Sequence, residues 1–114
     1  MTSKSSTTTR SREQSREDLL PLITPGEILQ EEFLQPLGLS VNALAKALHV
    51  PANRILAIVK NQRGITADTA LRLGRYFGST PQFWMNLQQN YELARAKREK
   101  WAKIQHQVRQ RVAA

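Results

Sequence analysis

A proline in the middle of a helical pattern is the feature that most constrains how this chain folds. The residues before it include an apolar set at spacings of three and four, Val41, Leu44, Ala45 and Leu48. Such spacing places them on one face of a helix, which Ser40 can cap at its start. Pro51 disfavours a helical conformation in the residue before it and suits the first position of a new helix. The sequence therefore predicts two short helices separated by a tight break at residues 49–51.

The second helix of this pair has one apolar face and one face of small and polar side chains. The stripe expected to be buried is Ile55, Ile58 and Val59. The opposite face holds Ala52, Asn53, Ala57 and Lys60. Two short helices joined by three or four residues, with a small residue such as Ala45 where they meet, are the pattern of a helix-turn-helix. An ordinary αα-hairpin with a solvated polar face has the same spacing, so the hairpin alone leaves both alternatives open.

Small and polar side chains let a helix approach base edges in the major groove of DNA, and hydrogen-bond donors read those edges. Asn53 and Arg54 supply donors near the start of the second helix. Ala52 and Ala57 leave room beside them. A polar and basic run, residues 60–63, follows at the exit of the helix, where phosphate contacts would lie. These residue types favour a helix that reads DNA.

The charge of the chain also favours a polyanion as its partner. The 114 residues are enough for one domain with a modest core. The net charge is +8 and the pI is near 10.6. Most of the excess lies after residue 80, where seven basic and two acidic side chains occur. A solvated helix face that keeps the protein soluble is the alternative explanation for this basic segment.

Composition disfavours several other classes of protein. The chain has no cysteine, which excludes a disulfide scaffold and a thiolate metal site. No stretch reaches the ~18 apolar residues of a membrane span, and the N-terminus lacks a signal-peptide core. The charge would suit a small nuclease, but His49 and His106 have no motif-spaced catalytic partner. We therefore expect a cytoplasmic protein that is not an enzyme, has no metal or cofactor, and does not enter a membrane.

Folded structure is predicted to begin at Thr24. Residues 1–18 are rich in serine, threonine and charge, and they cannot bury enough apolar surface to offset the entropy of ordering. We expect a disordered tail over residues 1–20. A capping box, in which Thr24 precedes a proline and Glu27, starts a helix over about residues 25–36.

Another helix is predicted soon after the pair. Thr66 caps it, and Gly78 follows its last residue, Phe77. The residues expected to face inward are Ala70, Leu71, Leu73 and Phe77. The helical pattern thus predicts an all-α, five-helix DNA-binding fold, with the helix-turn-helix domain over residues 24–80 and a long basic C-terminal helix over residues 81–110.

The long C-terminal helix has more apolar surface than a small helical core can cover, so part of it should pack on a second copy of the chain. The residues predicted at this dimer interface are Trp84, Tyr91, Trp101 and Val108. In the alternative, the start of the helix belongs to the core of the monomer, through Phe83, Trp84 and Leu87.

Three groups of residues give the chain a family resemblance. The opening group is Pro25-Gly26-Glu27-Ile28-Leu29, Glu32-Phe33-Leu34 and Pro36-Leu37-Gly38-Leu39-Ser40. The middle group is Leu44-Ala45, Leu48, Asn61-Gln62-Arg63-Gly64-Ile65-Thr66 and Ala70-Leu71-Arg72-Leu73. The closing group is Phe77-Gly78-Ser79-Thr80-Pro81, Phe83-Trp84 and Leu87-Gln88. With these groups, residues 24–87 resemble the HigA antitoxin family, a branch of the lambda-repressor-like (XRE) helix-turn-helix proteins.

The resemblance implies a function. Members of this family bind operator DNA as dimers, repress their own operon, and neutralise a toxin, a ribosome-associated messenger-RNA endonuclease of the RelE/HigB type. The resemblance implies base reading and phosphate contacts in the helix-turn-helix, and the residues predicted to contact DNA are Asn42, Lys46, Ala52, Asn53, Arg54, Ala57, Lys60 and Arg63. His49 stands where the family usually has glycine in a left-handed turn.

A toxin partner would need a surface outside the DNA-reading helices. Glu27, Glu31 and Glu32 form the most acidic cluster in the chain and suit a basic, RNA-binding partner. The alternative is that these glutamates only favour the positive end of the helix dipole. A stand-alone helix-turn-helix regulator without a toxin partner is the alternative function, and a purely structural helical protein is a further one.

Overall fold

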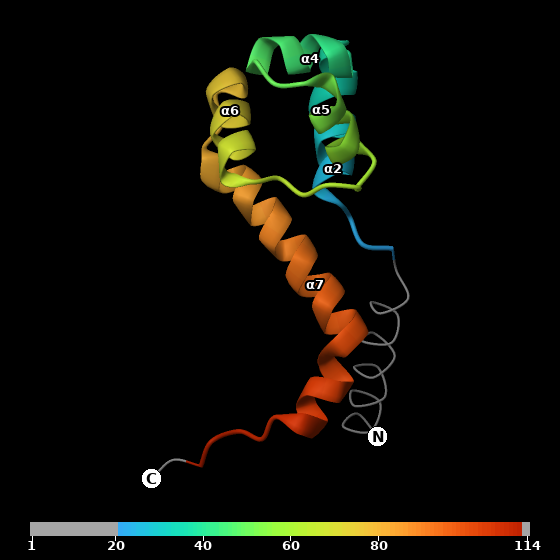
Figure 1. Ribbon diagram of the computed structural model, residues 1–114, viewed down its shortest axis with the longest axis vertical. Helices are drawn as coiled ribbons and strands as arrows, with labels where there is room; N and C mark the ends of the chain where they lie inside the picture. The colour runs from blue at the N-terminus through green and yellow to red at the C-terminus, as the bar shows by residue number, and fades with distance from the viewer. Residues whose placement is uncertain (1–20, 113–114) are drawn as a thin grey trace, which may run out of the picture.

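The computed structural model describes residues 21–112 as helices and connecting segments, arranged as a small helical body with one long projecting helix (Figure 1). The tail predicted for residues 1–20 lies outside the described residues. The elements in chain order are α2 (Pro25–Ile28), η1 (Leu29–Leu34), α3 (Gln35–Leu37), α4 (Val41–Leu48), α5 (Ala52–Val59), α6 (Ala67–Phe77) and α7 (Pro81–Gln107). The first three form one continuous rod, because the residues at their junctions, Leu29 and Gln35, are right-handed helical. Within residues 21–112 the predicted five-helix, all-α fold is therefore confirmed.

Side-chain caps mark the start of α2, α4, α6 and α7, whereas α5 follows Pro51 without one. The hydroxyl of Thr24 accepts a hydrogen bond from the N–H of Glu27 at 3.1 Å. The hydroxyl of Ser40 accepts one from Ala43 N–H at 3.0 Å. Thr66 and Thr80 cap α6 and α7 in the same way. Each cap satisfies a backbone donor that the helix itself leaves unpaired, so these boundaries are set by local sequence.

The core lies where this first rod meets α4, α5, α6 and α7. It contains most of the apolar residues that the helical spacing predicts to be buried. Its largest fully buried apolar side chains are Leu29, Leu34, Leu44, Ile55, Ile58, Leu73 and Trp84. Gly26 lets α2 pack closely on the end of α5, because a Cβ at this position would overlap the carbonyl oxygen of Ile58. The first helix therefore supports the C-terminal end of α5 through backbone contact.

Trp84 corrects the predicted dimer interface. Its side chain is 0% exposed, and its indole N–H donates to the hydroxyl of Ser79 at 2.9 Å. Its ring lies 4.8 Å from the ring of Phe33, which is also 4.8 Å from that of Phe77. The prediction that Trp84 belongs to a dimer interface is wrong, because this aromatic cluster removes it from the surface of the monomer.

Leu71 gives a second correction. It is 60% exposed, whereas Ala70 and Leu73 are fully buried. The prediction that Leu71 faces inward is wrong, because the spacing of Ala70, Leu73 and Phe77 already defines the face of α6 that meets the core.

The long helix α7 has two different halves. Its first half packs against α6, and the amide oxygen of Gln88 accepts a hydrogen bond from the buried N–H of Ile65 at 2.8 Å. From residue 95 onward every described residue is exposed, and Figure 1 shows this half extending away from α4. The helix ends at Gln107, three residues before the predicted end, because Val108 adopts an extended conformation. No helix within residues 21–112 has the length and apolar character needed to span a lipid bilayer.

Candidate DNA interface

The turn between α4 and α5 has the geometry that a helix-turn-helix requires. His49 is left-handed, with φ 58° and ψ 46°. Its N–H donates to the carbonyl of Lys46 at 3.1 Å, and the N–H of Val50 donates to that of Ala45 at 3.0 Å. This pair of bonds is a Schellman motif, which satisfies the carbonyls at the end of a helix. Histidine adopts the left-handed conformation more readily than bulky or β-branched residues, so the turn forms without glycine.

The outer surface of α5 and the residue after it carry several of the residues predicted to contact DNA. Ile55 and Ile58 are buried, which turns Ala52, Asn53 and Lys60 to the outside. Ala57 is half-buried beside them. The structure thus places three of these predicted contacts on one exposed strip along α5, with Ala57 at its margin.

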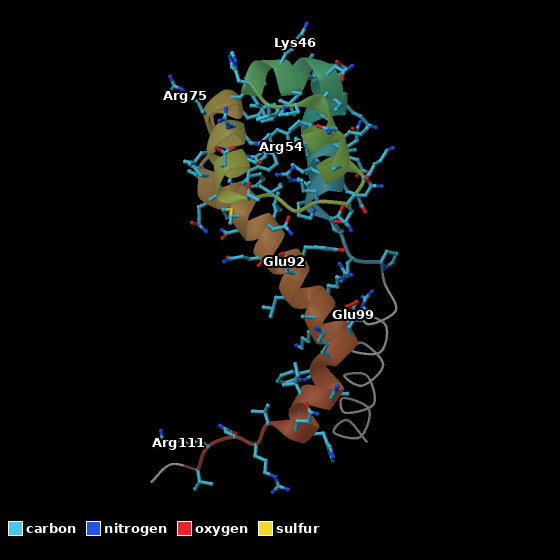
Figure 2. All side chains as sticks on the ribbon, viewed as in Figure 1. Lys46, Arg54, Arg75, Glu92, Glu99 and Arg111 are labelled. Atoms are coloured by element: carbon cyan, nitrogen blue, oxygen red, sulfur yellow. The ribbon has the colours of Figure 1, made fainter. Side chains whose placement is uncertain are left out.

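Two residues of α4 and one beyond α5 extend this surface. Asn42 and Lys46 are both exposed and lie one turn apart on α4. Lys46 projects away from the helical body, as Figure 2 shows. Arg63 is exposed in the segment after α5. The surface formed by Asn42, Lys46, Ala52, Asn53, Leu56, Lys60 and Arg63 is called here the α4–α5 surface.

Arg54 differs from the prediction. Its side chain is 25% exposed, and its Nη1 donates to Oδ2 of Asp68 in α6 at 3.0 Å. Figure 2 labels it between α5 and α6, away from the outward Lys46. A guanidinium held by a carboxylate of the same chain is not presented to base edges, so this arrangement does not fit the predicted role of Arg54 as a base-reading donor.

The segment after α5 is tied to α7. Asn61 is left-handed, with φ 57°, and its side-chain amide donates to the hydroxyl of Tyr91 at 2.8 Å. The N–H of Gln62 donates to the carbonyl of Ala57 at 2.8 Å. These bonds fix the path of the chain beside Lys60 and hold Tyr91 toward the helix-turn-helix.

Sequence reasoning missed one residue of the α4–α5 surface. Leu56 is 41% exposed on α5, three residues after Asn53 and four before Lys60. This spacing places the three residues on one helix face, so the position could have been found from the sequence. An exposed leucine there is suited to contact with the methyl group of thymine.

The other predicted surfaces are exposed in part. Glu27, Glu31 and Glu32 are all exposed on α2 and η1. Of the residues predicted at the dimer interface, Tyr91 is half-buried within the monomer, while Trp101 and Val108 are exposed. The exposed apolar residues of α7 also include Leu93 and Ile104, which the prediction left out. Within residues 21–112, no group of three or more histidine and carboxylate side chains is arranged to hold a metal ion.

Known proteins with the same fold and sequence pattern place this geometry in a family. A model of the helix-turn-helix family matches residues 31–84. Virulence-associated protein I of Dichelobacter nodosus is 62% identical over 81 residues, which are 71% of this chain and 75% of that protein. The Pseudomonas aeruginosa antitoxin HigA, solved with the higBA promoter, has a TM-score of 0.78 and 49% identity, covering 81% of this chain and 100% of its own. A HigA-family addiction module antidote protein from Coxiella burnetii has a TM-score of 0.77 and 47% identity, covering 81% of this chain and 100% of its own. The chain therefore belongs to the HigA family of helix-turn-helix antitoxins.

Proposed function

We propose that this protein is a DNA-binding antitoxin, which represses its own operon and neutralises a messenger-RNA endonuclease toxin of the RelE/HigB type. The observation that carries the proposal is the α4–α5 surface, an exposed strip of small, polar and basic side chains on a capped helix-turn-helix. The Pseudomonas aeruginosa relative was solved with promoter DNA, which supports the same partner here. Such a protein acts where its operator is, in the cytoplasm.

Residues of this surface divide into two roles. Asn53 and Leu56 lie on the exposed face of α5, where an amide can read adenine and a leucine can contact a thymine methyl group. Lys46, Lys60 and Arg63 flank them and carry positive charge that suits phosphates. Base contacts give sequence discrimination, while phosphate contacts give affinity for every sequence.

A homodimer is part of this proposal. One helix-turn-helix buries little surface for tight specific binding, and a two-fold dimer places two α5 helices on half-sites about one helical turn, ~34 Å, apart. Exposed apolar side chains of α7 support this assembly. Leu93, Trp101 and Ile104 are exposed, and their spacing of eight and three places them on one face of the helix.

The toxin is proposed to bind the acidic cluster of Glu27, Glu31 and Glu32. All three side chains are exposed, and they lie on α2 and η1 rather than on α4 or α5. Acidic side chains complement the basic surface that an RNA-cleaving partner needs. DNA and toxin can therefore use different elements of the same chain.

Co-expression with the adjacent gene, if it encodes a small basic protein, tests the proposed function. The protein is expected to copurify with that product and to suppress its messenger-RNA cleavage. It is also expected to retard the DNA upstream of its own gene in a shift assay, in preference to random DNA. Operator binding without any copurifying toxin would contradict the antitoxin role and support a stand-alone regulator, whereas binding to neither would contradict both.

A further inference from the structure

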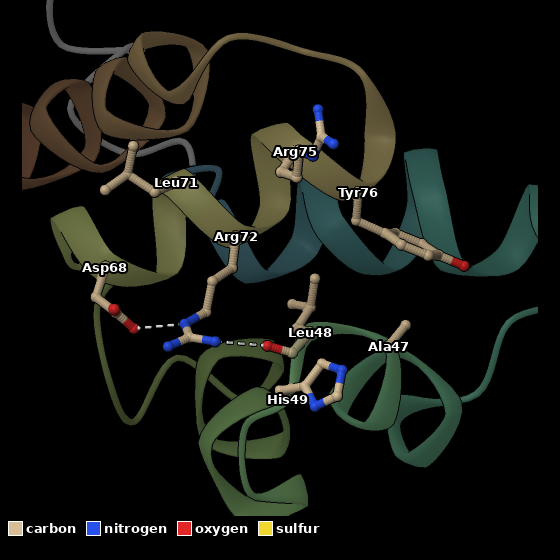
Figure 3. Close-up of a pocket in the computed structure, with 8 residues that line it drawn as sticks. All are labelled: Ala47, Leu48, His49, Asp68, Leu71, Arg72, Arg75 and Tyr76. Carbon is tan, nitrogen blue, oxygen red and sulfur yellow. Dashed lines mark hydrogen bonds and ion pairs between the residues drawn. The ribbon is translucent and has the colours of Figure 1, made fainter.

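One carboxylate joins two arginines, one on α5 and one on α6. Oδ2 of Asp68, in the first turn of α6, accepts from Nη1 of Arg54 at 3.0 Å and from Nε of Arg72 at 2.9 Å. Nη1 of Arg72 also donates to the carbonyl of Leu48, the last residue of α4, at 2.9 Å. Figure 3 shows Arg72 between Asp68 and Leu48 in this arrangement. The two cations are thus drawn toward the protein by one acidic group.

Stability alone gives little reason for this arrangement. The side chain of Asp68 is 57% exposed and that of Arg72 is 40% exposed, and ion pairs that face water contribute little to folding. Nε of Arg54 is buried without a hydrogen-bond partner within residues 21–112, and an unpaired buried donor is unfavourable. An arrangement that stabilises weakly and leaves a donor unpaired calls for another reason.

We propose that Asp68 is a positioning residue that lowers the affinity of the protein for DNA of any sequence, because it keeps Arg54 from binding a phosphate. The inference rests on the proposed binding of DNA by the α4–α5 surface. Arg54 is on α5 itself, immediately after Asn53. A cation at this position that reached a phosphate would strengthen binding to every sequence. With Arg54 held by Asp68, Asn53 and Leu56 are the residues of α5 that distinguish one DNA sequence from another.

An acidic residue in the first turn of a helix also interacts favourably with the helix dipole. The experiment must therefore distinguish this simpler role of Asp68 from its proposed hold on Arg54. The variant Asp68→Asn keeps the shape of the side chain and removes its charge. Affinity of the full chain for a random duplex is measured as a function of salt concentration. We expect affinity for random DNA to rise, and the log–log salt slope to steepen by about 0.9 for each arginine that reaches a phosphate. Affinity for the operator should rise by a similar factor, because a phosphate contact strengthens binding to every sequence.

Glu99→Gln is the matched control. Glu99 also pairs with an arginine, Arg95, at 3.3 Å, but this pair lies in the projecting half of α7. Its substitution changes the net charge by the same amount, and the salt slope should stay as in the unchanged protein. Equal steepening in both variants would overturn the proposal, because a general charge effect would then explain it.

The double variant Asp68→Asn, Arg54→Gln identifies the cation. Its salt slope should fall back by about 0.9 from that of Asp68→Asn alone. A slope that stayed steep would show that Arg54 is not held back by Asp68. A helix-dipole role would change thermal stability but not the salt slope, so an unchanged slope in Asp68→Asn also overturns the proposal.

The unchanged protein supplies a test that does not depend on how the variants fold. The NMR signal of the Arg54 Nε–H group should keep its position when random DNA is added, and signals of Lys60 should move. A shift of the Arg54 signal would place this side chain on DNA and overturn the inference. If the unchanged protein did not prefer operator over random DNA, the proposed function would fail first, and that outcome is distinct from a failure of Asp68 alone.

Discussion

Gly26 shows how a residue without a side chain can position the helix that faces DNA. Its backbone lies against the carbonyl of Ile58, near the end of α5, where a Cβ would overlap that oxygen. The pattern of apolar residues cannot reveal such a contact, because it depends on which two backbones meet. The position of α5 therefore depends on a residue that the sequence analysis names only within the pattern of the family resemblance.

The variant Gly26→Ala should destabilise the protein by ~2 kcal/mol or more, because overpacking against backbone forces α2 away from α5. Urea denaturation followed by circular dichroism measures the change. Gly38→Ala is the matched control: Gly38 has φ 61° but open space around its Cβ position, so its cost should be only about 1 kcal/mol. Equal losses in the two variants would contradict close packing at Gly26.

Asp68 gives a prediction about pH. The hydrogen bond from Arg72 is the main reason that the pKa of this carboxyl lies below its ordinary value of 3.8, and Arg54 lowers the pKa further. A group whose pKa is lower in the folded state stabilises it above the ordinary pKa, and this contribution is lost as pH falls through the lowered pKa. The difference in unfolding free energy between the unchanged protein and Asp68→Asn should therefore be constant above pH 3.8 and shrink below it. A difference that stayed constant into strong acid would contradict the ion pairs.

At the scale of elements, the sequence predicts where helices begin and which face of most helices is buried. Thr24, Ser40 and Thr66 cap helices as predicted, because capping depends only on residues within one turn. The buried faces of α4 and α5 can be predicted from their apolar spacing, because that spacing also depends only on residues close together in the sequence.

Errors arise where a side chain has partners far along the chain. Trp84 is part of an aromatic cluster with Phe33 and Phe77, and the spacing within α7 does not show whether a tryptophan packs on its own chain or on another. Arg54 is held by a residue fourteen positions away. The sequence therefore predicts which face of α5 carries candidates for reading bases. It does not predict which of their hydrogen-bond donors are already paired with another residue of the chain.

The acidic cluster on α2 and η1 gives a prediction at this scale. Changing Glu31 and Glu32 together to lysine should abolish toxin neutralisation, because attraction to a basic partner becomes repulsion. Operator affinity at fixed salt should change only a few-fold. Neutralisation is measured by toxin-dependent growth arrest in cells that express each variant.

The matched control for the acidic cluster changes Glu92 and Glu99 of α7 to lysine, with the same change in net charge. Neutralisation should be retained there. If the Glu31 and Glu32 variant still neutralised the toxin, the toxin would bind another surface of the chain.

At the scale of the whole molecule, the exposed half of α7 gives the dimer its proposed contact. Trp101 is 44% exposed on the face that also carries Leu93 and Ile104. Trp101→Glu should yield monomers by light scattering and weaken operator binding, because it places a charge in an apolar contact. Ala102→Glu introduces the same charge on the opposite face of the helix and should stay dimeric. A Trp101→Glu protein that remained dimeric would contradict this interface.

The most direct test of the α4–α5 surface compares Asn53→Ala with Lys60→Ala on operator and random duplexes across a range of salt concentrations. Loss of a base contact should cost ~1–3 kcal/mol per half-site on the operator and leave binding to random DNA almost unchanged. Loss of a phosphate contact should weaken both duplexes and lower the salt slope by about one per half-site. If Asn53→Ala weakened operator and random DNA equally, α5 would not be the helix that reads the sequence.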